Sequence, residues 1–430
     1  EVRMKMNSKV NRSVYFWNFA GNIAAAAVSI LYLIIVSRHT SASDADNFSL
    51  AYAIGNLWIV IGMFQVRNYQ ATDLKETYSY LEYCLTRVIT VCLMLVTLFP
   101  YLFFSGNNVG KGNLFIIVIL TVLYRSCDAF SDLFQGLFQQ HERLDIAGKL
   151  MVLRYGVSTI ILLISLLFTN SLIFSLVCLC FFNVLFVFLG DYCQSKKIKT
   201  IPFNQISYTT FKRSISIMKT CLPLFVNGFL LVYVLNYPKQ VIDKLLVEGV
   251  LREGAQRDFS ILFMPVFFMS LFVLALRPLI TDLAKQWSEK RFHTFNAMVS
   301  KILLLLMILG LVISTLAYLI GIPILNIISG IDLSNYSLLL TILVLSGFLY
   351  SIASVIGDFL IILRKQVYLL YVYIAMALLT NFLTPLAMRE FGLLGAGLSF
   401  ILVMLFYTFA SWILFVTMRR KEIQKYESVE

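Results

Sequence analysis

Residues 48–73 read FSLAYAIGNLWIVIGMFQVRNYQATD, and residues 259–282 read FSILFMPVFFMSLFVLALRPLITD. Each stretch opens with Phe-Ser, continues through an apolar run, and reaches an arginine, Arg67 or Arg277, shortly before Thr-Asp. The spacing from Phe to Arg is 19 residues in the first copy and 18 in the second. Duplicated membrane units with a charge at matching positions are typical of secondary transporters. The pair therefore predicts a protein built from two related halves.

The composition excludes an ordinary soluble domain. Of the 430 residues, 59% are hydrophobic and 13% are charged, whereas soluble domains carry about 45–50% apolar and about 25% charged residues. The apolar residues form blocks of about 20, which as helices are long enough to cross the hydrocarbon core of a bilayer. Because the blocks lack strict alternation, helices are expected rather than the strands of a barrel. The predicted fold class is an all-α polytopic membrane protein.

Twelve membrane spans are expected, at residues 14–37, 48–66, 83–105, 113–136, 150–168, 171–191, 215–236, 259–280, 298–320, 336–362, 367–388 and 393–418. A basic connector near the midpoint divides them into an N-terminal lobe at 1–193, a linker at 194–214, and a C-terminal lobe with a cytoplasmic tail at 215–430. Six spans per half predict two lobes related by a pseudo-two-fold axis along the membrane normal, around a central cavity.

The distribution of Lys and Arg predicts the orientation. With the N-terminus inside, 27 of the 35 basic residues fall on the cytoplasmic side, Arg87 and Arg154 included, seven fall on the other side, and Arg125 lies within a span. The positive-inside rule then places both termini in the cytoplasm. The net charge of +12 is interpreted as this orientation bias and not as a nucleic-acid surface. The first span has no small-residue cleavage site followed by a soluble domain, so a cleavable signal peptide is not expected.

The span at 113–136 carries polar residues on one face. They recur every three or four residues, a helical spacing, at Arg125, Asp128, Asp132, Gln135 and Gln139. Ionisable groups inside a bilayer cost several kcal/mol, so each is a hypothesis about function. Two interpretations remain open: a stripe that lines a water-filled cavity, or an intrahelical pair in which Arg125 and Asp128 neutralise each other.

The span that begins at residue 215 carries a second polar group. Pro223 and Pro238 are expected to interrupt its helix, as in the broken helices of transporter sites. If the helix continues past Pro238, Lys239 and Asp243 lie one turn apart near the outer mouth. The alternative is a span that ends at Asn236 and leaves both charged residues solvated.

Arg67, Arg277 and Arg154 are candidate anion ligands near the cytoplasmic ends of their spans. An arginine can hold a phosphate with two parallel hydrogen bonds, which lysine cannot. The alternative is that they are snorkelling anchors of the membrane surface. No Walker A, HExxH or GxSxG motif is present, and the three histidines are scattered. No catalytic residue, metal or cofactor is therefore expected, and the protein is not expected to be an enzyme.

Four stretches carry a resemblance to a known family: QVRNYQATD at 65–73, FQQHERLDIAGKLMVLRYG at 138–156, LPLFVNGFLLVYVLNYPKQVIDKLL at 222–246 and FSILFMPVFFMSLFVLALRPLITDLAKQW at 259–287. The chain resembles the Wzx-type polysaccharide flippases of the multidrug/oligosaccharidyl-lipid/polysaccharide exporter superfamily. The resemblance covers most of the chain.

The resemblance implies a bacterial cytoplasmic-membrane flippase. It would move an undecaprenyl-pyrophosphate-linked oligosaccharide repeat unit from the inner to the outer leaflet by alternating access, for capsule, exopolysaccharide or O-antigen synthesis. The implied substrate-binding residues are basic: Arg67, Arg125, Arg277, Arg154 and Lys239. Asp128, Asp132 and Asp243 would balance these charges or bind a coupling H+ or Na+. The implied partners are the lipid-linked substrate, membrane lipids, and a polysaccharide polymerase with its chain-length regulator, with no nucleic acid.

Two alternatives follow from the same sequence. A multidrug exporter of the same superfamily would share the architecture but would need an acidic cavity for its cationic cargo. A membrane polysaccharide polymerase or glycosyltransferase would need a long external loop with catalytic groups, and no connector predicted to lie outside exceeds about 25 residues.

Overall fold

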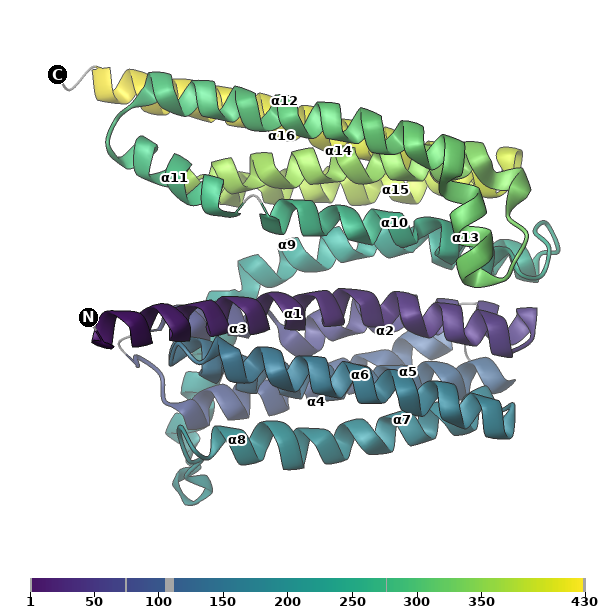
Figure 1. The fold of residues 1–430 in the computed structure, drawn as a ribbon, viewed down its shortest axis with the longest axis horizontal. Helices are drawn as coiled ribbons and strands as arrows, with labels where there is room; N and C mark the ends of the chain where they lie inside the picture. Colours follow the sequence, from purple (N-terminus) through teal and green to yellow (C-terminus); the bar gives the residue numbers. More distant parts are fainter. Residues whose placement is uncertain (1, 74–75, 105–111, 276, 428–430) are drawn as a thin grey trace. The chain divides into compact units, whose positions relative to one another are not determined.

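The computed structural model describes residues 2–73, 76–104, 112–275 and 277–427, and leaves undescribed the side chains of residues 2–12, 72, 203, 267–278, 281, 366 and 425–427. Every element within these ranges is helical, which confirms the predicted all-α fold class (Figure 1). Contacts divide the chain into two compact units, Glu1–Val232 and Tyr233–Glu430. The division falls inside one long helix, which contributes residues to both units.

The first unit contains the helices of the N-terminal half: α1 (Val2–His39), α2 (Ala42–Met63), α3 (Val66–Thr72), α4 (Tyr80–Phe104), α5 (Gly112–Gln140), α6 (Leu144–Thr169), α7 (Leu172–Phe186), the π-helix η2 (Val187–Tyr192), α8 (Cys193–Ser195), the 3-10 turn η3 (Phe203–Gln205) and the first part of α9 (Tyr208–Val247). Helix α5 packs against α2, α4 and α7, and α1 packs along α6. This central position explains why α5 can bring polar groups from several helices together.

Close backbone contact between α1 and α6 depends on glycine. A Cβ atom added to Gly148 would lie 1.9 Å from the carbonyl oxygen of Trp17, and one added to Gly21 would lie 2.8 Å from the Cα of Gly148. Small residues at such crossings allow membrane helices to approach closely, and dispersion contacts then hold them together. The two glycines therefore fix the packing of α1 on α6.

The second unit continues with α10 (Ala255–Ala275), α11 (Arg277–Ser288), α12 (Phe292–Leu316), the π-helix η4 (Ala317–Gly321), α13 (Ile322–Ser329), η5 (Ser334–Tyr336), α14 (Ser337–Ile362), η6 (Gln366–Tyr368), α15 (Leu369–Phe391) and α16 (Leu393–Glu427). Helix α14 is central in this unit, because it packs against α10, α12 and α16. It corresponds in this respect to α5 in the first unit.

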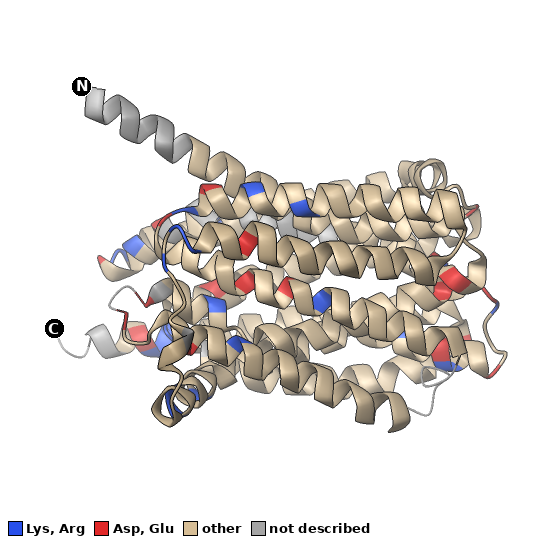
Figure 2. Cartoon of the chain, turned by 90° about the horizontal axis from the view of Figure 1, so that it is seen from below, with Lys and Arg blue, Asp and Glu red and all other residues tan. Residues whose placement is uncertain are grey.

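The helices match the expected membrane spans. Ten of the described helical segments are long and apolar enough to cross a bilayer. The two other predicted spans fall on α2 and α10, whose first turns carry Asp44 and Asp258. Many large apolar side chains are exposed, among them Phe168 at 84%, as expected for surfaces that face lipid. Figure 2 shows charged positions gathered mostly near helix ends and in connecting segments, with a few inside the long helices.

The predicted span at 48–66 ends earlier than expected. Helix α2 stops at Met63, and both Phe64 and Gln65 adopt left-handed backbone angles, with φ of 47° and 55°. Such angles are unfavourable for residues with a side chain. They are held here by the ring of Phe225, which stacks on Phe64 at 4.2 Å, and by a 2.7 Å hydrogen bond from Asn68 to Gln65. The break starts α3 in a new direction and thereby sets the position of Arg67.

The first repeated stretch is divided by this break into α2 and α3, and Arg67 lies in the first turn of α3. The second stretch is described as α10 up to Ala275 and as α11 from Arg277, and residue 276 between them lies outside the described residues. That the two stretches are copies of one unit stays a prediction.

Helix α9 corrects one prediction. Pro223 and Pro238 were expected to interrupt it, but the helix is continuous from Tyr208 to Val247. A proline removes one backbone hydrogen bond, and membrane helices tolerate this where neighbouring groups satisfy the freed carbonyl. The alternative of a span that ends at Asn236 with solvated charges is also wrong, because Lys239 and Asp243 are buried.

Candidate functional site

Asp128, on α5, binds two arginines from different helices. One carboxylate oxygen accepts a 2.9 Å hydrogen bond from Arg125, one turn earlier on α5, and the other forms an ion pair with Arg154 of α6. The hydroxyl of Tyr155 donates to the same carboxylate at 3.3 Å. The interpretation of Arg125 and Asp128 as a self-contained pair is therefore wrong: Asp128 also joins α5 to α6.

Arg125 is held by more than its aspartate. Its guanidinium donates to the side-chain oxygen of Asn56 on α2 and lies over the ring of Tyr52, 4.4 Å from the ring centroid. A cation above an aromatic face is attracted to the ring, most strongly where water is excluded. These contacts fix Arg125 between α2 and α5.

Arg154 is almost completely buried, with 1% of its surface exposed. Its Nε donates a 2.7 Å hydrogen bond to Asn183 of α7, whose amide in turn donates to Ser158 at 3.0 Å. A buried arginine is stable only when its charge is paired and its donors are satisfied. Asp128 and Asn183 provide both conditions and connect α5, α6 and α7 through one side chain.

Asp132, one turn further along α5, also binds two arginines. Arg87 of α4 lies 2.8 Å from one carboxylate oxygen, and Arg67 of α3 lies 3.5 Å from the other. Arg87 is completely buried and also donates at 2.6 Å to the carbonyl of Gly62, in the last turn of α2. A helix ends with unpaired carbonyls that carry partial negative charge, so a cation at this point is favourable.

Arg67 differs from the other three arginines in its exposure. Its side chain is 28% exposed, and it donates to the amide oxygens of Gln135 at 2.7 Å and Gln139 at 3.2 Å. Both glutamines belong to the polar face of α5 that the sequence predicted. Because its nearest partners are neutral amides, much of the positive charge of Arg67 remains available to another anion.

We call these six residues the α5 charge cluster: Arg67, Arg87, Arg125, Arg154, Asp128 and Asp132. Four arginines share two aspartates within the first unit. A third carboxylate, Asp191 of η2, is buried and interacts electrostatically with Arg154. Counting Asp191 as ionised, the four arginines of this group exceed its three carboxylates by one, so the group carries a net positive charge.

Part of this cluster was not predicted from the sequence. Arg87 was counted only among the basic residues near loops, whereas its side chain is buried and paired with Asp132. Arg154 was proposed as an anion ligand, and its side chain is buried and paired with Asp128. The available indication was that Arg87 follows the start of an apolar helix by two turns and lies beside Thr86 and Thr90. Asp191 was not identified at all.

The predicted site residues of the second unit are only partly described. Lys239 is buried, with 5% of its surface exposed, and its ammonium group lies 5.9 Å from the centroid of the Phe263 ring. Asp243 follows one turn later on α9 and is also buried. The side chain of Arg277 lies outside the described residues. Whether these residues share a site with the α5 charge cluster stays a prediction.

The loop between α3 and α4 is organised around Asp73. Its carboxylate accepts hydrogen bonds from the backbone of Thr77 at 2.8 Å and of Tyr78 at 3.0 Å, and from the hydroxyl of Tyr83 at 2.9 Å. Burial by itself raises the pKa of Asp73, but these hydrogen bonds favour the ionised form and together lower the pKa below its ordinary value. Thr77, Tyr78 and Tyr83 are thereby attached to Asp73 at the end of α3.

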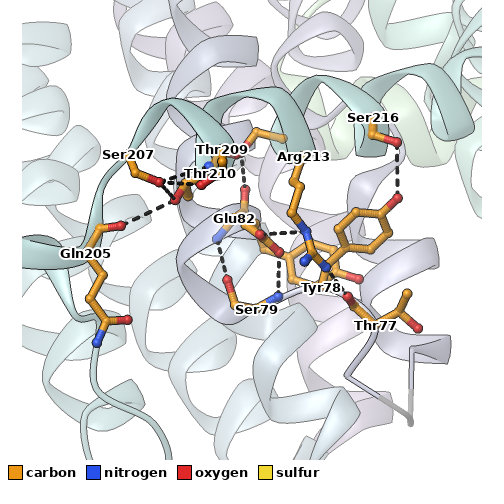
Figure 3. A network of polar contacts seen from close by, with 12 residues as sticks. Thr77, Tyr78, Ser79, Glu82, Gln205, Ser207, Thr209, Thr210, Arg213 and Ser216 are labelled. Atoms are coloured by element: carbon orange, nitrogen blue, oxygen red, sulfur yellow. Dashed lines mark hydrogen bonds and ion pairs between the residues drawn. The ribbon is translucent and has the colours of Figure 1, made fainter.

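A network of polar contacts joins this loop to α9 (Figure 3). Arg213 forms a 2.8 Å ion pair with Glu82 at the start of α4 and donates to the carbonyl of Thr77. The hydroxyl of Ser214 donates to the carbonyl of Glu82 at 3.0 Å, and Tyr78 contacts Ser216 at 3.2 Å. The beginning of α9 is therefore anchored to α4 within the first unit.

No group of three or more His, Cys, Asp or Glu side chains that could hold a metal ion occurs among the residues the structure describes.

No protein-family model matches this sequence, and no curated protein sequence does either. Solved structures do match along nearly the whole chain. The lipid II flippase MurJ, in an inward closed conformation, has a TM-score of 0.66 at 14% identity over 93% of this chain and 89% of its own. A MATE transporter in complex with MaL6 has a TM-score of 0.64 at 13% identity, over 97% of both chains.

A third match is a MOP superfamily transporter from Pyrococcus furiosus, for which a reversed polarity of the binding pocket suggests a different function. It has a TM-score of 0.60 at 14% identity and covers 96% of this chain and 95% of its own. The chain therefore has the fold of the MATE and MOP membrane transporters, a multi-pass helical fold that MurJ shares.

Proposed function

We propose that this protein is a flippase that carries an undecaprenyl-pyrophosphate-linked oligosaccharide repeat unit to the outer leaflet of a bacterial cytoplasmic membrane. Its product would feed the synthesis of capsule, exopolysaccharide or O-antigen. The fold supports a transporter, because MATE transporters and the lipid II flippase MurJ share it. The fold does not separate the two kinds of cargo, so the choice depends on charge.

The observation that carries the proposal is Arg67. It is the partly exposed arginine of an electropositive cluster, and its closest partners are the neutral amides of Gln135 and Gln139. A pyrophosphate presents oxygens that a guanidinium binds with two parallel hydrogen bonds. A cationic drug would instead be repelled by the excess of arginine. In this proposal Asp128 and Asp132 balance the buried arginines, with Asp128 holding Arg125 and Arg154.

The remaining predicted residues keep their proposed roles. Arg277 would match Arg67 in the second repeat, and Lys239 with Asp243 would form a second buried charged group on α9. The carboxylates of Asp128, Asp132 and Asp243 are proposed to bind H+ or Na+ during transport. The lipid-linked substrate, membrane lipids, and a polymerase with its chain-length regulator are the proposed partners.

The test is a leaflet assay for the substrate. Cells depleted of the protein are expected to accumulate completed lipid-linked repeat units on the cytoplasmic face and to lose surface glycan. Unpolymerised units on the outer face would instead indicate an enzyme that acts after transport. No change in either pool would contradict the proposal and favour the multidrug exporter, which a drug-efflux measurement on the same cells would then detect.

Arg67 provides the residue-level test. We expect Arg67→Ala to lower the translocation rate in proteoliposomes about tenfold or more, since a charge-assisted hydrogen bond contributes about 1.5–3 kcal/mol. Arg67→Lys is expected to recover part of the rate, because it keeps the charge without the two parallel donors. Arg143→Ala is the matched control, since Arg143 forms an exposed ion pair with Asp145. Wild-type rates in Arg67→Ala would remove Arg67 from the site.

A further inference from the structure

The first unit contains an apolar pocket that the proposed transport does not use. It has a volume of about 520 Å³ and lies among α4, α5, α7 and η2. Val88 of α4, Phe130 and Phe134 of α5, and Val184 of α7 belong to its lining. Pockets of roughly 300–1,000 Å³ with apolar walls are the usual size for small ligands. None of the residues of the α5 charge cluster lines it.

The pocket opens toward the surface that faces lipid. Val88 and Val184 in its lining are each 45% exposed, and Phe188 in its lining is 60% exposed. Exposed apolar side chains on a membrane-spanning helix lie against acyl chains, because water is absent from that region. The natural occupant of such a recess is therefore a hydrocarbon chain from the bilayer.

A π-helical turn shapes the pocket. Val187, Phe188 and Tyr192 of the lining all come from η2 (Val187–Tyr192), where the regular helix widens. Single π-helical turns inside α-helices are rare and occur frequently at functional sites. The turn is also closely packed, because a Cβ atom added to Gly190 would lie 2.9 Å from the ring of Phe186.

Positive charge stands at one end of the pocket. The ammonium group of Lys196 lies 4.5 Å from the centroid of the Tyr192 ring, and Tyr192 lines the pocket. Lys196 and Lys197 are both exposed, and Ile201, five residues after Lys196, returns to the lining. An apolar recess that ends in exposed lysines is complementary to a lipid with an anionic headgroup.

We propose that this pocket binds one anionic phospholipid, with an acyl chain between α4, α5 and η2 and its phosphate on Lys196 and Lys197. The bound lipid would fill the recess next to η2 and α8, from which the connector to α9 departs. A neutral lipid would gain the apolar contacts but not the two charge contacts. The site is separate from the α5 charge cluster, so it does not depend on the proposed cargo.

Native mass spectrometry of the detergent-purified protein tests the proposal. With equal amounts of phosphatidylglycerol and phosphatidylethanolamine of the same chain length, we expect retention of one phosphatidylglycerol in preference. Lys196→Gln with Lys197→Gln is expected to weaken its binding about fivefold for each lysine removed. Lys212→Gln is the matched control, because Lys212 is an exposed lysine of the same unit on α9, whereas Lys196 lies over the ring of Tyr192 in the pocket lining.

The apolar part of the site has its own variant. Val184→Phe should fill the recess and abolish retention of the lipid, whereas Val177→Phe should not, since Val177 is 47% exposed on the same helix but lies outside the lining. Equal retention of both phospholipids, or binding unchanged by the lysine and Val184 variants, would overturn the proposal. Preferential retention of an undecaprenyl phosphate over phosphatidylglycerol would also overturn it and identify a site for the cargo lipid. Because the readout is binding, its failure leaves the proposed transport untouched.

Discussion

Asp132 neutralises the buried charge of Arg87 on α4. It pairs with the fully buried Arg87 at 2.8 Å and with Arg67 at 3.5 Å. Removal of one partner from a buried ion pair leaves an uncompensated charge, which costs about 3–5 kcal/mol. We therefore expect Asp132→Asn to lower the thermal unfolding temperature in detergent strongly. Asp145→Asn, in an exposed pair with Arg143, should cost at most about 1 kcal/mol.

A second substitution at this ion pair should restore the stability lost in Asp132→Asn. If the loss in Asp132→Asn comes from the unpaired charge of Arg87, then Arg87→Met in the same chain should recover much of the stability, because an apolar side chain of similar length needs no partner. A double variant that is no more stable than Asp132→Asn would show that the carboxylate stabilises the protein in some other way.

Asp73 gives a prediction of pH dependence. Hydrogen bonds from Thr77, Tyr78 and Tyr83 lower its pKa in the folded protein. The carboxylate therefore stabilises the fold above the ordinary aspartate pKa of about 3.9, and this contribution is lost as pH falls through the lower folded pKa. We expect Asp73→Asn to be less stable than wild type at pH 7 by about 1–3 kcal/mol.

The difference should begin to shrink as the pH falls below the ordinary aspartate pKa of about 3.9, because the carboxylate of the unfolded wild-type chain then becomes protonated. Thermal unfolding at pH 7, 5 and 3 measures it. Glu76→Gln is the matched control in the same loop, where Glu76 forms an exposed pair with Lys199. A deficit of Asp73→Asn that is the same at every pH would contradict this account.

At the scale of the element, glycine decides how α1 and α6 cross. A Cβ atom on Gly148 would lie 1.9 Å from a backbone oxygen of α1, which cannot move away as a side chain would. We expect Gly148→Ala to separate the two helices and to lower stability by more than about 1 kcal/mol. Gly156→Ala, on the same helix with open space around it, should be neutral or stabilising by up to about 1 kcal/mol.

The measurement is thermal unfolding of the two variants side by side. Both replace glycine by alanine in α6, so helix propensity is matched and only the contact with α1 differs. Equal stability of the two variants would mean that α1 adjusts without cost.

The anchor between α4 and α9 gives a second prediction at this scale. Arg213 binds Glu82 and the carbonyl of Thr77, and so attaches the first turns of α9 to the start of α4 (Figure 3). Loss of these two contacts should make the first turns of α9 open more often, because fewer bonds then hold them to α4. We expect Arg213→Ala to increase amide hydrogen exchange around Ser207–Ser214, with a smaller effect for Lys212→Ala. Unchanged exchange in Arg213→Ala would show that Ser214 and Ser216 are sufficient.

The helices were predictable from the sequence, whereas the contacts between them were not. Apolar blocks of about 20 residues predicted the helices, because each helix satisfies its own backbone within a membrane. The spacing of three to four residues placed Asp128, Asp132, Gln135 and Gln139 on one face of α5, because a helical face is determined by spacing along the chain alone. The partners were not predictable in this way. Arg87 pairs with Asp132 across 45 residues of sequence, and only the packing of α4 on α5 brings them together.

Arg154 illustrates the same limit. The sequence placed it near the start of the span at 150–168 and proposed it as an anion ligand, but its partners Asp128 of α5 and Asn183 of α7 follow only from the packing of the helices. Similarly, the prolines of α9 predicted a broken helix, whereas the surrounding structure keeps it continuous. The sequence shows which charged or proline residues fall within an apolar helix, where they cost free energy. Contacts with other helices decide whether such a residue is buried and paired.

For the whole molecule, the repeated stretches are the basis of the predicted two related halves. Sequence alone matched Arg67 with Arg277. The structure places Arg67 in the first turn of α3, after the left-handed residues Phe64 and Gln65. Residue 276 lies outside the described residues, so the equivalence of Arg277 stays a prediction, which parallel substitutions of both arginines would test.

The orientation of the molecule is the last prediction. The 27-to-7 distribution of Lys and Arg predicts that the connector after α8 faces the cytoplasm and the connector after α9 faces the other side. Cys193, the exposed native cysteine of α8, reports on the first connector. A membrane-impermeant thiol reagent should label Cys193 in inside-out vesicles and leave it unlabelled in intact cells.

Glu253→Cys in a Cys193→Ser background reports on the second connector, because Glu253 is exposed between α9 and α10. It should show the opposite pattern, with labelling in intact cells. Cys92 is exposed on α4 within a predicted span, so the polar reagent should not reach it in either preparation. Labelling of Cys193 in intact cells together with protection of residue 253 would reverse the orientation.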